Sequence, residues 1–319
     1  MTLLGHDEPW REWRAAAGGA RMHHGWILAG RRGLGKASFA FAAAGELVGG
    51  ATGGGPDPHA HPDILVLEPL ADGDEEERKR AEGKPFKAKR GISVDQVRAM
   101  QRRLTTRPTL GDRRAVIVDA ADDLERGAFN ALLKSLEEPP AGTFFILVAH
   151  QPGRLPATIR SRCRVLRFAD LGDDEVARVL DANLAAVSAE TKDAAVAVAN
   201  GAPGAALDFA TRELTAAHTL MERITREGDS DFALRGRLLA EIGQRPDRDQ
   251  QLAAIECARM VLVRAVPDAG RTRARRIVEA HGGLARLLVQ APTANFDPTT
   301  LMLEIGGLLA SVAADREAP

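Results

Sequence analysis

Residues 115–163 read AVIVDAADDLERGAFNALLKSLEEPPAGTFFILVAHQPGRLPATIRSRC, and this stretch decides the fold. The runs at 115–118 and 144–148 are apolar and rich in β-branched residues, which predicts two buried strands. The segment between them has helical character and ends at Pro139-Pro140, because proline cannot continue a helix. A strand, a helix and a second strand in this order predict a parallel α/β sheet. In such sheets, functional residues gather where the strands end.

The whole chain has the composition of a globular protein. Its 319 residues are 45% hydrophobic, and that length predicts two domains of roughly 150 residues each. Charge is balanced, with 43 Lys and Arg against 44 Asp and Glu, so no overall basic field marks a nucleic-acid-binding protein. Two cysteines, Cys163 and Cys257, cannot build a disulfide framework, which fits a reducing cytoplasm. No apolar run reaches about 18 residues, and the N-terminus does not resemble a signal peptide. We therefore expect a cytoplasmic protein without membrane contact.

Further elements are predicted before this stretch. The apolar runs at 26–29 and 64–67 predict two more strands, and 36–48 has helical character. Ser93 is a suitable cap for a helix that follows it. Residues 71–91 are highly charged and poor in apolar side chains, so we predict an exposed, mobile loop, with a partner-binding segment as the alternative.

After Phe168 the pattern becomes helical. Runs rich in Ala and Leu predict helices over 173–183, 190–199 and 201–225, and helical periodicity continues from 231 to 315. We therefore predict three domains, an α/β domain followed by a small helical domain and a larger helical domain, over 1–168, 169–225 and 226–319.

A glycine-rich turn follows the predicted strand at 26–29. It reads Gly30-Arg31-Arg32-Gly33-Leu34-Gly35-Lys36, which matches the phosphate-loop pattern G-x-x-x-x-G-K between a strand and a helix. Such a loop turns backbone N–H groups and a lysine toward phosphates, and a Ser or Thr after the lysine holds Mg²⁺. Here Ala37 follows Lys36, and alanine cannot bind metal. The alternative is a turn that keeps the fold and binds nucleotide weakly or not at all.

Asp119 is the second part of the predicted nucleotide site, at the end of the strand 115–118. A carboxylate there can hold a metal ion through water. The next residue, which would activate the attacking water, is Ala120, and alanine cannot act as a general base. The polar residue expected after the strand 144–148 would be Ala149 or His150. Ala149 has no hydrogen-bonding side chain, and a structural role is the favoured interpretation of His150.

Two segments of this region resemble a known family. The runs NALLKSLEEPP at 130–140 and LPATIRSRC at 155–163 resemble the AAA+ clamp-loader family, most closely the bacterial DNA polymerase III clamp-loader subunits. Residues 21–168 resemble the ATPase domain of that family, 169–225 its lid domain, and 295–303 part of its C-terminal collar. The resemblance implies an AAA+ P-loop-type α/β domain with a parallel sheet, a small helical lid, and an all-helical collar that mediates oligomerisation.

The tripeptide Ser161-Arg162-Cys163 is the signature of these subunits. In the family its arginine projects across a subunit interface onto the γ-phosphate of ATP bound by a neighbour, so the resemblance implies that Arg162 is an arginine finger acting in trans. The alternative is an ordinary surface or fold-stabilising arginine. Many family members also carry a four-cysteine zinc module. Residues 48–62 hold no cysteine, and His59 and His61 alone cannot build a structural zinc site, so we predict no zinc or other metal.

Departures from the family pattern indicate the kind of subunit. The motor subunits, of the tau/gamma type, keep a hydroxyl after the P-loop lysine, an Asp-Glu pair, and a sensor arginine in the lid. This sequence has Ala37, Asp119-Ala120 and Gly204 at those positions. That profile resembles the delta-prime-type members, which act as a stator and arginine-finger donor.

The resemblance therefore implies a non-catalytic component of DNA polymerase III in DNA replication. It has no catalytic residue acting in cis and requires no cofactor, while weak ATP or ADP binding stays open. The implied partners are tau/gamma-like motor subunits and a delta-like subunit, with the sliding clamp and primed DNA reached through the assembled complex. One alternative is an active ATPase motor of the same family, against which Ala37, Ala120 and Gly204 count. A P-loop kinase would leave the helical C-terminal third unexplained.

Overall fold

The computed structural model describes residues 4–19, 22–49, 57–84, 86–184, 187–243, 246, 248–291 and 296–313. The chain divides into two compact units between Asp170 and Leu171. Each unit has its own apolar core, one formed by residues between Ile27 and Val165 and the other by residues between Leu171 and Val312. Among the described residues, no helix is both long and apolar enough to cross a membrane.

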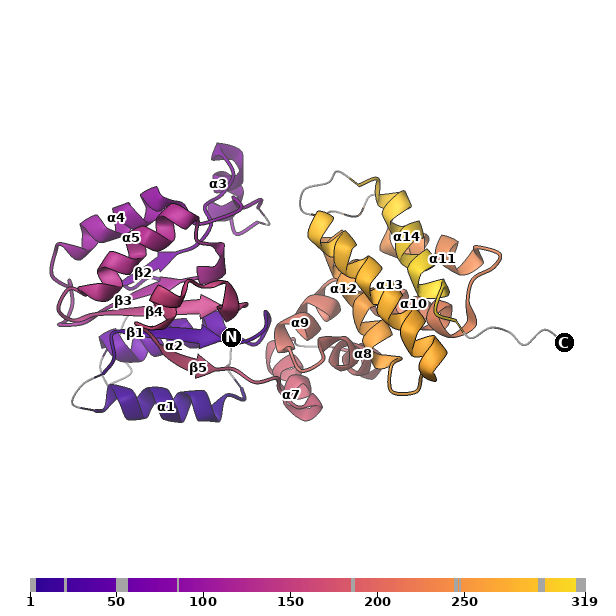
Figure 1. Cartoon of the computed structure of the whole chain (residues 1–319), viewed down its shortest axis with the longest axis horizontal. Coiled ribbons are helices and arrows are strands. Elements are labelled where there is room, and N and C mark those ends of the chain that lie inside the picture. Colours follow the sequence, from indigo (N-terminus) through magenta and orange to yellow (C-terminus); the bar gives the residue numbers. More distant parts are fainter. Residues whose placement is uncertain are drawn as a thin grey trace. The chain divides into compact units, whose positions relative to one another are not determined.

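The first unit is built on a parallel five-stranded sheet, which confirms the predicted fold class (Figure 1). The strand order is β2-β3-β4-β1-β5. The strands are β1 (Gly25–Ala29), β2 (Ile64–Leu67), β3 (Arg114–Val118), β4 (Thr143–Ala149) and β5 (Arg164–Arg167). The four apolar runs of the sequence are the first four strands, while β5 was not predicted.

Helices cover both faces of this sheet (Figure 1). α4 (Val94–Leu104) and α5 (Arg126–Glu137) lie on one face, while α2 (Lys36–Gly49) lies on the other with α1 (Asp7–Ala17) beside it. The cluster that includes α4 and α5 takes Ile27 and Ala29 from β1, while Trp26 and Leu28, which alternate with them, are fully buried on the opposite face. Burial on both faces explains why these strands read as continuous apolar runs. Ser93 caps α4 as predicted.

The prediction of a loop throughout 71–91 is wrong, because residues 74–81 form the helix α3 (Asp74–Ala81). Four acidic residues occupy its first turn and three basic residues its last turn, an order that complements the helix dipole. An ion pair of 2.5 Å between Lys87 and Asp72, and an antiparallel bridge between Ala71 and Ala88, tie the flanking chain together. No residue of α3 is buried, although Ala71 at the start of the charged segment is.

The second unit is entirely helical over its described residues. Its helices are α7 (Asp173–Asn183), α8 (Ala189–Ala199), α9 (Pro203–Thr211), α10 (Thr215–Glu227), α11 (Ala233–Ile242), α12 (Arg248–Arg264), α13 (Arg271–Gln290) and α14 (Pro298–Ala310). The helix predicted over 201–225 is two helices, because Glu213 takes a left-handed conformation between them. The boundary predicted at residue 225 falls inside α10, which packs against α11, α12 and α14, so a division there stays a prediction.

Candidate functional site

The loop between β1 and α2 has the backbone geometry that its glycines predict. Gly30 donates its N–H to the carbonyl of Ala149 over 3.2 Å, and a Cβ at Gly30 would lie 2.7 Å from the carbonyl oxygen of Phe168. Gly33 and Gly35 have φ angles of 84° and 75°, which favour glycine. The loop therefore requires glycine at positions 30, 33 and 35. A short connection from strand to helix is thereby held in a phosphate-loop form.

Lys36 is buried at the start of α2, with an exposed fraction of 2%. Its Nζ donates to the carbonyl of Arg31 over 2.5 Å, so the lysine closes the loop on itself. Burial lowers the pKa of Lys36 to about 8, while the charges of Asp119 and Asp122 act in the opposite direction. The charges of Lys36, at the start of α2, and of Asp119, just after β3, thus influence one another.

Asp119 follows β3, where burial and the nearby carboxylate of Glu68 raise its pKa and Lys36 opposes the shift. Ala120 is buried with an exposed fraction of 4% and offers no general base. Ala37 stands in the first turn of α2 and offers no metal ligand. The site therefore has the loop and the lysine of an ATPase, but neither the hydroxyl nor the glutamate that hydrolysis uses.

Asp122 is a residue of this site that the sequence analysis missed. Its Oδ2 accepts hydrogen bonds from the backbone N–H groups of His150, at 2.5 Å, and Gln151, at 3.2 Å. Its Oδ1 and the Nδ1 of His150 are buried without a hydrogen-bond partner among the described residues. Burial and the charge of Lys36 lower the pKa of His150 to about 4. The only signal in the sequence was a second carboxylate three residues after Asp119.

Ser161-Arg162-Cys163 follows the short helix α6 (Ala157–Arg160) and precedes β5. Ser161 ends that helix, and its Oγ donates to the carbonyl of Thr158 over 3.1 Å. Burial raises the pKa of the Cys163 thiol to about 12, so the sulfur stays protonated. Cys163 packs tightly on the start of β1, because a Cβ at Gly25 would lie 3.0 Å from its Sγ. Ser161 and Cys163 thus fix the backbone on either side of Arg162.

Arg162 lies at the surface, with 37% of its side chain exposed. Its Nη2 forms an ion pair with Oε1 of Glu137, at the end of α5, over 2.8 Å. Its backbone adjoins Gly25, the first residue of β1, whereas Gly30 begins the loop at the other end of that strand. Because a strand rises about 3.3 Å per residue, the Arg162 backbone and the loop are roughly 15 Å apart. The structure therefore does not bring Arg162 to the chain's own phosphate loop.

The two histidines considered for zinc have other contacts. Nδ1 of His61 accepts the backbone N–H of Asp63 over 3.1 Å, and the ring of His59 stacks on Phe41 with centroids 4.0 Å apart. Across the part of the chain that the structure describes, no three His, Cys, Asp or Glu side chains are grouped as metal ligands. Gly204, at the expected place of a lid arginine, lies in the first turn of α9.

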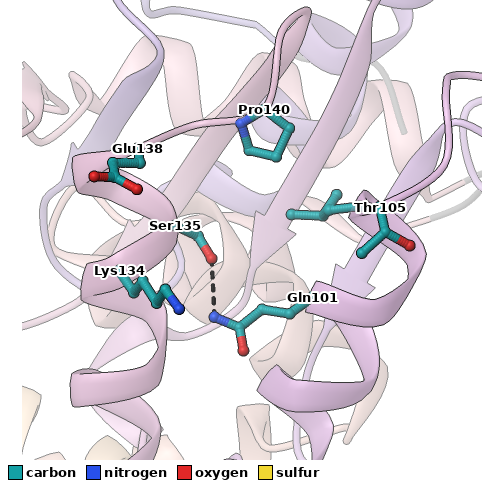
Figure 2. Close-up of a pocket in the computed structure, with 7 residues that line it drawn as sticks. Gln101, Thr105, Lys134, Ser135, Glu138 and Pro140 are labelled. Atoms are coloured by element: carbon teal, nitrogen blue, oxygen red, sulfur yellow. Dashed lines mark hydrogen bonds between the residues drawn. The ribbon is translucent and has the colours of Figure 1, made fainter.

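A pocket of about 320 Å³ lies between α4 and α5 (Figure 2). Gln101 reaches across it and donates to Oγ of Ser135 over 3.0 Å and to the carbonyl of Ala131 over 2.8 Å. The pocket is lined by Gln101, Leu104, Thr105, Lys134, Ser135, Glu138 and Pro140. None of the predicted site residues lines this pocket. The hydrogen bonds of Gln101 join α4 to α5.

Comparisons with known proteins agree with the observed fold and identify one family that matches this chain. A family model described as DNA polymerase III, delta subunit, matches residues 5–172. A protein of Pseudomonas aeruginosa named DNA polymerase III subunit delta' is 35% identical over 168 residues, covering 49% of this chain and 46% of that protein. The protein of the same name from Escherichia coli is 41% identical over 123 residues, covering 39% of this chain and 36% of that protein. The matched region is thus less than half the length of either relative.

Two further comparisons concern a tau/gamma subunit and a solved structure. A DNA polymerase III subunit tau/gamma from Haemophilus influenzae is 31% identical over 168 residues, covering 50% of this chain and 22% of that protein. Among solved structures, a DNA polymerase III gamma subunit-related protein from Thermotoga maritima has a TM-score of 0.57 and 17% identity. That likeness covers 95% of this chain and 99% of the solved one, and it shows a shared fold.

Proposed function

Because the chain belongs to the family described as DNA polymerase III, delta subunit, we propose that it is a delta-prime-type stator of the DNA polymerase III clamp loader. In this role it does not hydrolyse ATP. It donates Arg162 to the ATP site of a neighbouring tau/gamma-like motor subunit and so helps to load the sliding clamp on primed DNA. One observation carries the proposal: Arg162 is exposed at the end of β1 opposite to a phosphate loop that lacks its catalytic partners.

The chain's own site fits a phosphate group better than it fits catalysis. Gly30, Gly33, Gly35 and Lys36 supply the loop and the cation that phosphates bind. With Ala37 in place of a hydroxyl and Ala120 in place of a base, the residues do not provide the usual Mg²⁺ ligand or water activation. Burial lowers the pKa of His150 to about 4, so its imidazole is neutral near pH 7 and lacks the negative charge of the missing glutamate.

The loop also has no structural need for a nucleotide. The Lys36 ammonium donates to the carbonyl of Arg31, and Nε2 of His6 donates to the carbonyl of Leu34 over 2.7 Å. The charge of Lys36 is offset by Asp119 and Asp122. These internal contacts support a rigid loop that binds ATP or ADP weakly and requires no cofactor.

Arginine suits catalysis in trans for physical reasons. Phosphoryl transfer spreads charge over the γ-phosphoryl oxygens in the transition state, and a guanidinium placed there stabilises that charge. The planar, permanently charged fork of arginine can contact two oxygens together. Arginine fingers increase rates by about 10³- to 10⁵-fold in other systems. In the proposed complex the finger is Arg162, and Ser161 and Cys163 hold its backbone in place.

The partners follow from the same assignment. Relatives named delta' and relatives named tau/gamma both match this chain, which supports a complex that contains tau/gamma-like subunits. The proposed partners also include a delta-like subunit, the sliding clamp and primed DNA, which this chain meets through the assembled complex. The helical second unit supplies the lid over 169–225 and the oligomerising collar over 226–319. Asp297 caps α14 in the proposed collar segment, while Asn295 lies outside the described residues.

Measurements of ATP binding and hydrolysis by the isolated chain test whether its own phosphate loop lacks ATPase activity. We expect weak or absent ATP binding in a titration, and hydrolysis at background rate with or without primed DNA. Lys36→Ala, which removes the phosphate-binding cation, should leave that rate unchanged. DNA-stimulated hydrolysis that Lys36→Ala abolishes would instead establish the alternative, an active motor subunit.

A further inference from the structure

We propose that Glu137 is a positioning residue for Arg162, which orders the guanidinium for its contact with a neighbouring nucleotide. This inference rests on the proposed arginine-finger function. It starts from the ion pair of 2.8 Å between Oε1 of Glu137 and Nη2 of Arg162. The two residues come from different elements, since Glu137 is the last residue of α5 and Arg162 follows α6.

The guanidinium of Arg162 is held from two sides. While Nη2 contacts Glu137, Nη1 donates to the carbonyl of Thr158 over 3.0 Å and approaches Oγ of Ser161 at 3.4 Å. A long arginine side chain has many rotamers, and ordering it before docking reduces the entropy lost when it binds. Removal of the Glu137 charge would weaken the hold on one of these two sides, because the ion pair is lost.

The stability of α5 does not explain a glutamate at position 137. The carboxyl end of a helix carries partial negative charge, so a carboxylate is unfavourable there and a cation is favourable. α5 nevertheless ends with Glu137 in its last turn and Glu138 at its cap. The guanidinium of Arg162 is attracted both by Glu137 and by this helix end. The ion pair therefore accounts for a residue that the helix alone would disfavour.

The pair leaves Arg162 able to bind a further anion. A guanidinium has five N–H donors, and the contacts of Arg162 with described residues involve Nη1 and Nη2 but not Nε. The side chains of Arg162 and Glu137 are 37% and 43% exposed, so the fork is accessible to a partner. Glu137 can thus keep hold of one edge of the guanidinium while another edge meets phosphate oxygens.

The test is ATP hydrolysis by the complete clamp-loader complex on primed DNA, assembled with variants of this chain. Glu137→Gln keeps the length of the side chain and removes its charge, and we expect kcat to fall several-fold with KM unchanged. Glu138→Gln is the matched control, because it removes the same charge from the same helix end without an ion pair to Arg162 among the described contacts. Glu137→Asp keeps the charge and should recover part of the loss.

A double variant separates positioning from other effects. If Glu137 acts through Arg162, Glu137→Gln should change nothing in a complex that already carries Arg162→Ala. An equal loss in both backgrounds, an equal loss with Glu138→Gln, a rate increase, or failure of the Glu137→Gln chain to assemble would each overturn the inference. If Arg162→Ala itself leaves the rate unchanged, the arginine-finger function fails instead. If Arg162→Ala slows the complex but Glu137→Gln does not, the positioning role of Glu137 is refuted while the arginine-finger function stands.

Discussion

His150 illustrates, at the scale of a single residue, how surroundings set the chemistry of a side chain. It follows β4 beside Lys36 and Asp122, and its Nδ1 is buried without a partner among the described residues. Burial and the lysine charge lower its pKa to about 4, although Asp122 acts in the other direction. The imidazole is therefore neutral at physiological pH.

This shift predicts a pH dependence of stability. A group whose pKa is lower in the folded protein binds fewer protons there than in the unfolded chain. The contribution of His150 is therefore complete above pH 6.5, its ordinary pKa, and is lost as the pH falls through about 4. We predict that the free energy of unfolding falls less steeply across this window in His150→Gln than in the native sequence. Urea unfolding at pH 6.5 and at steps toward pH 4 measures the slope.

The control for this measurement is His59→Gln, which removes an exposed imidazole stacked on Phe41. It should keep the native pH dependence. Identical slopes for His150→Gln and the native sequence would show that His150 does not carry the shift.

At the scale of elements, two buried charged residues hold the loop between α4 and β3. The carboxylate of Asp63 is fully buried and accepts the backbone N–H groups of Thr109, at 2.7 Å, and Leu110, at 2.8 Å. Arg114 lies 3.6 Å from it and donates to the backbone carbonyls of Arg103, in the last turn of α4, and of Thr106 and Arg107 in the loop. This network fixes the entry to β3, the strand that Asp119 follows.

We predict that Asp63→Ala lowers the free energy of unfolding by about 3–5 kcal/mol, since it leaves the buried Arg114 without its carboxylate. Two N–H groups of the loop also lose their acceptor. Asp112→Ala removes an exposed carboxylate from the same loop and should change stability by less than about 0.5 kcal/mol. Chemical denaturation of both variants decides the matter, and equal losses would contradict the assigned network.

The elements that the sequence predicts well are those buried on both faces. β3 and β4 lie inside the sheet, so their apolar runs are continuous and their positions follow directly. β5 is an edge strand of four residues whose two arginines, Arg164 and Arg167, are exposed, so it lacks such a run. Charge content alone predicts a loop around α3, whereas the order of its charges, acidic first and basic last, favours a helix through the helix dipole.

The sequence predicts those site residues whose positions are set by the ends of strands, but not the contacts that depend on loops. The charges of Lys36 and Asp119 act on one another because the loop after β1 and the residue after β3 lie at the carboxyl ends of parallel strands, which share one edge of the sheet. The contact of Asp122 with the backbone of His150 depends on the conformation of two loops. The pairing of Glu137 with Arg162 likewise depends on how α6 follows β4. Spacing in the sequence does not determine such loop contacts.

At the scale of the whole molecule, the phosphate loop and Arg162 lie at opposite ends of one strand of the first unit. The phosphate loop at one end of β1 keeps its shape through internal contacts, including those of Lys36. Arg162 stands at the other end of the same strand, ordered by α5 and α6. A rigid domain of this kind can present a guanidinium outward while its own nucleotide site stays inactive. We therefore propose that Arg162 acts on the ATP site of a neighbouring subunit.

The most direct measurement is ATP hydrolysis and clamp loading by complexes that differ only in this chain, carrying Arg162→Ala, Arg162→Lys or Lys36→Ala. We predict that Arg162→Ala assembles normally but slows hydrolysis and loading. The loss should be smaller than the roughly 10³- to 10⁵-fold of a single finger, because other ATP sites keep working. Arg162→Lys should recover little, since a point charge does not replace the fork, and Lys36→Ala should behave as the native chain does. Native rates from an assembled Arg162→Ala complex would contradict the account.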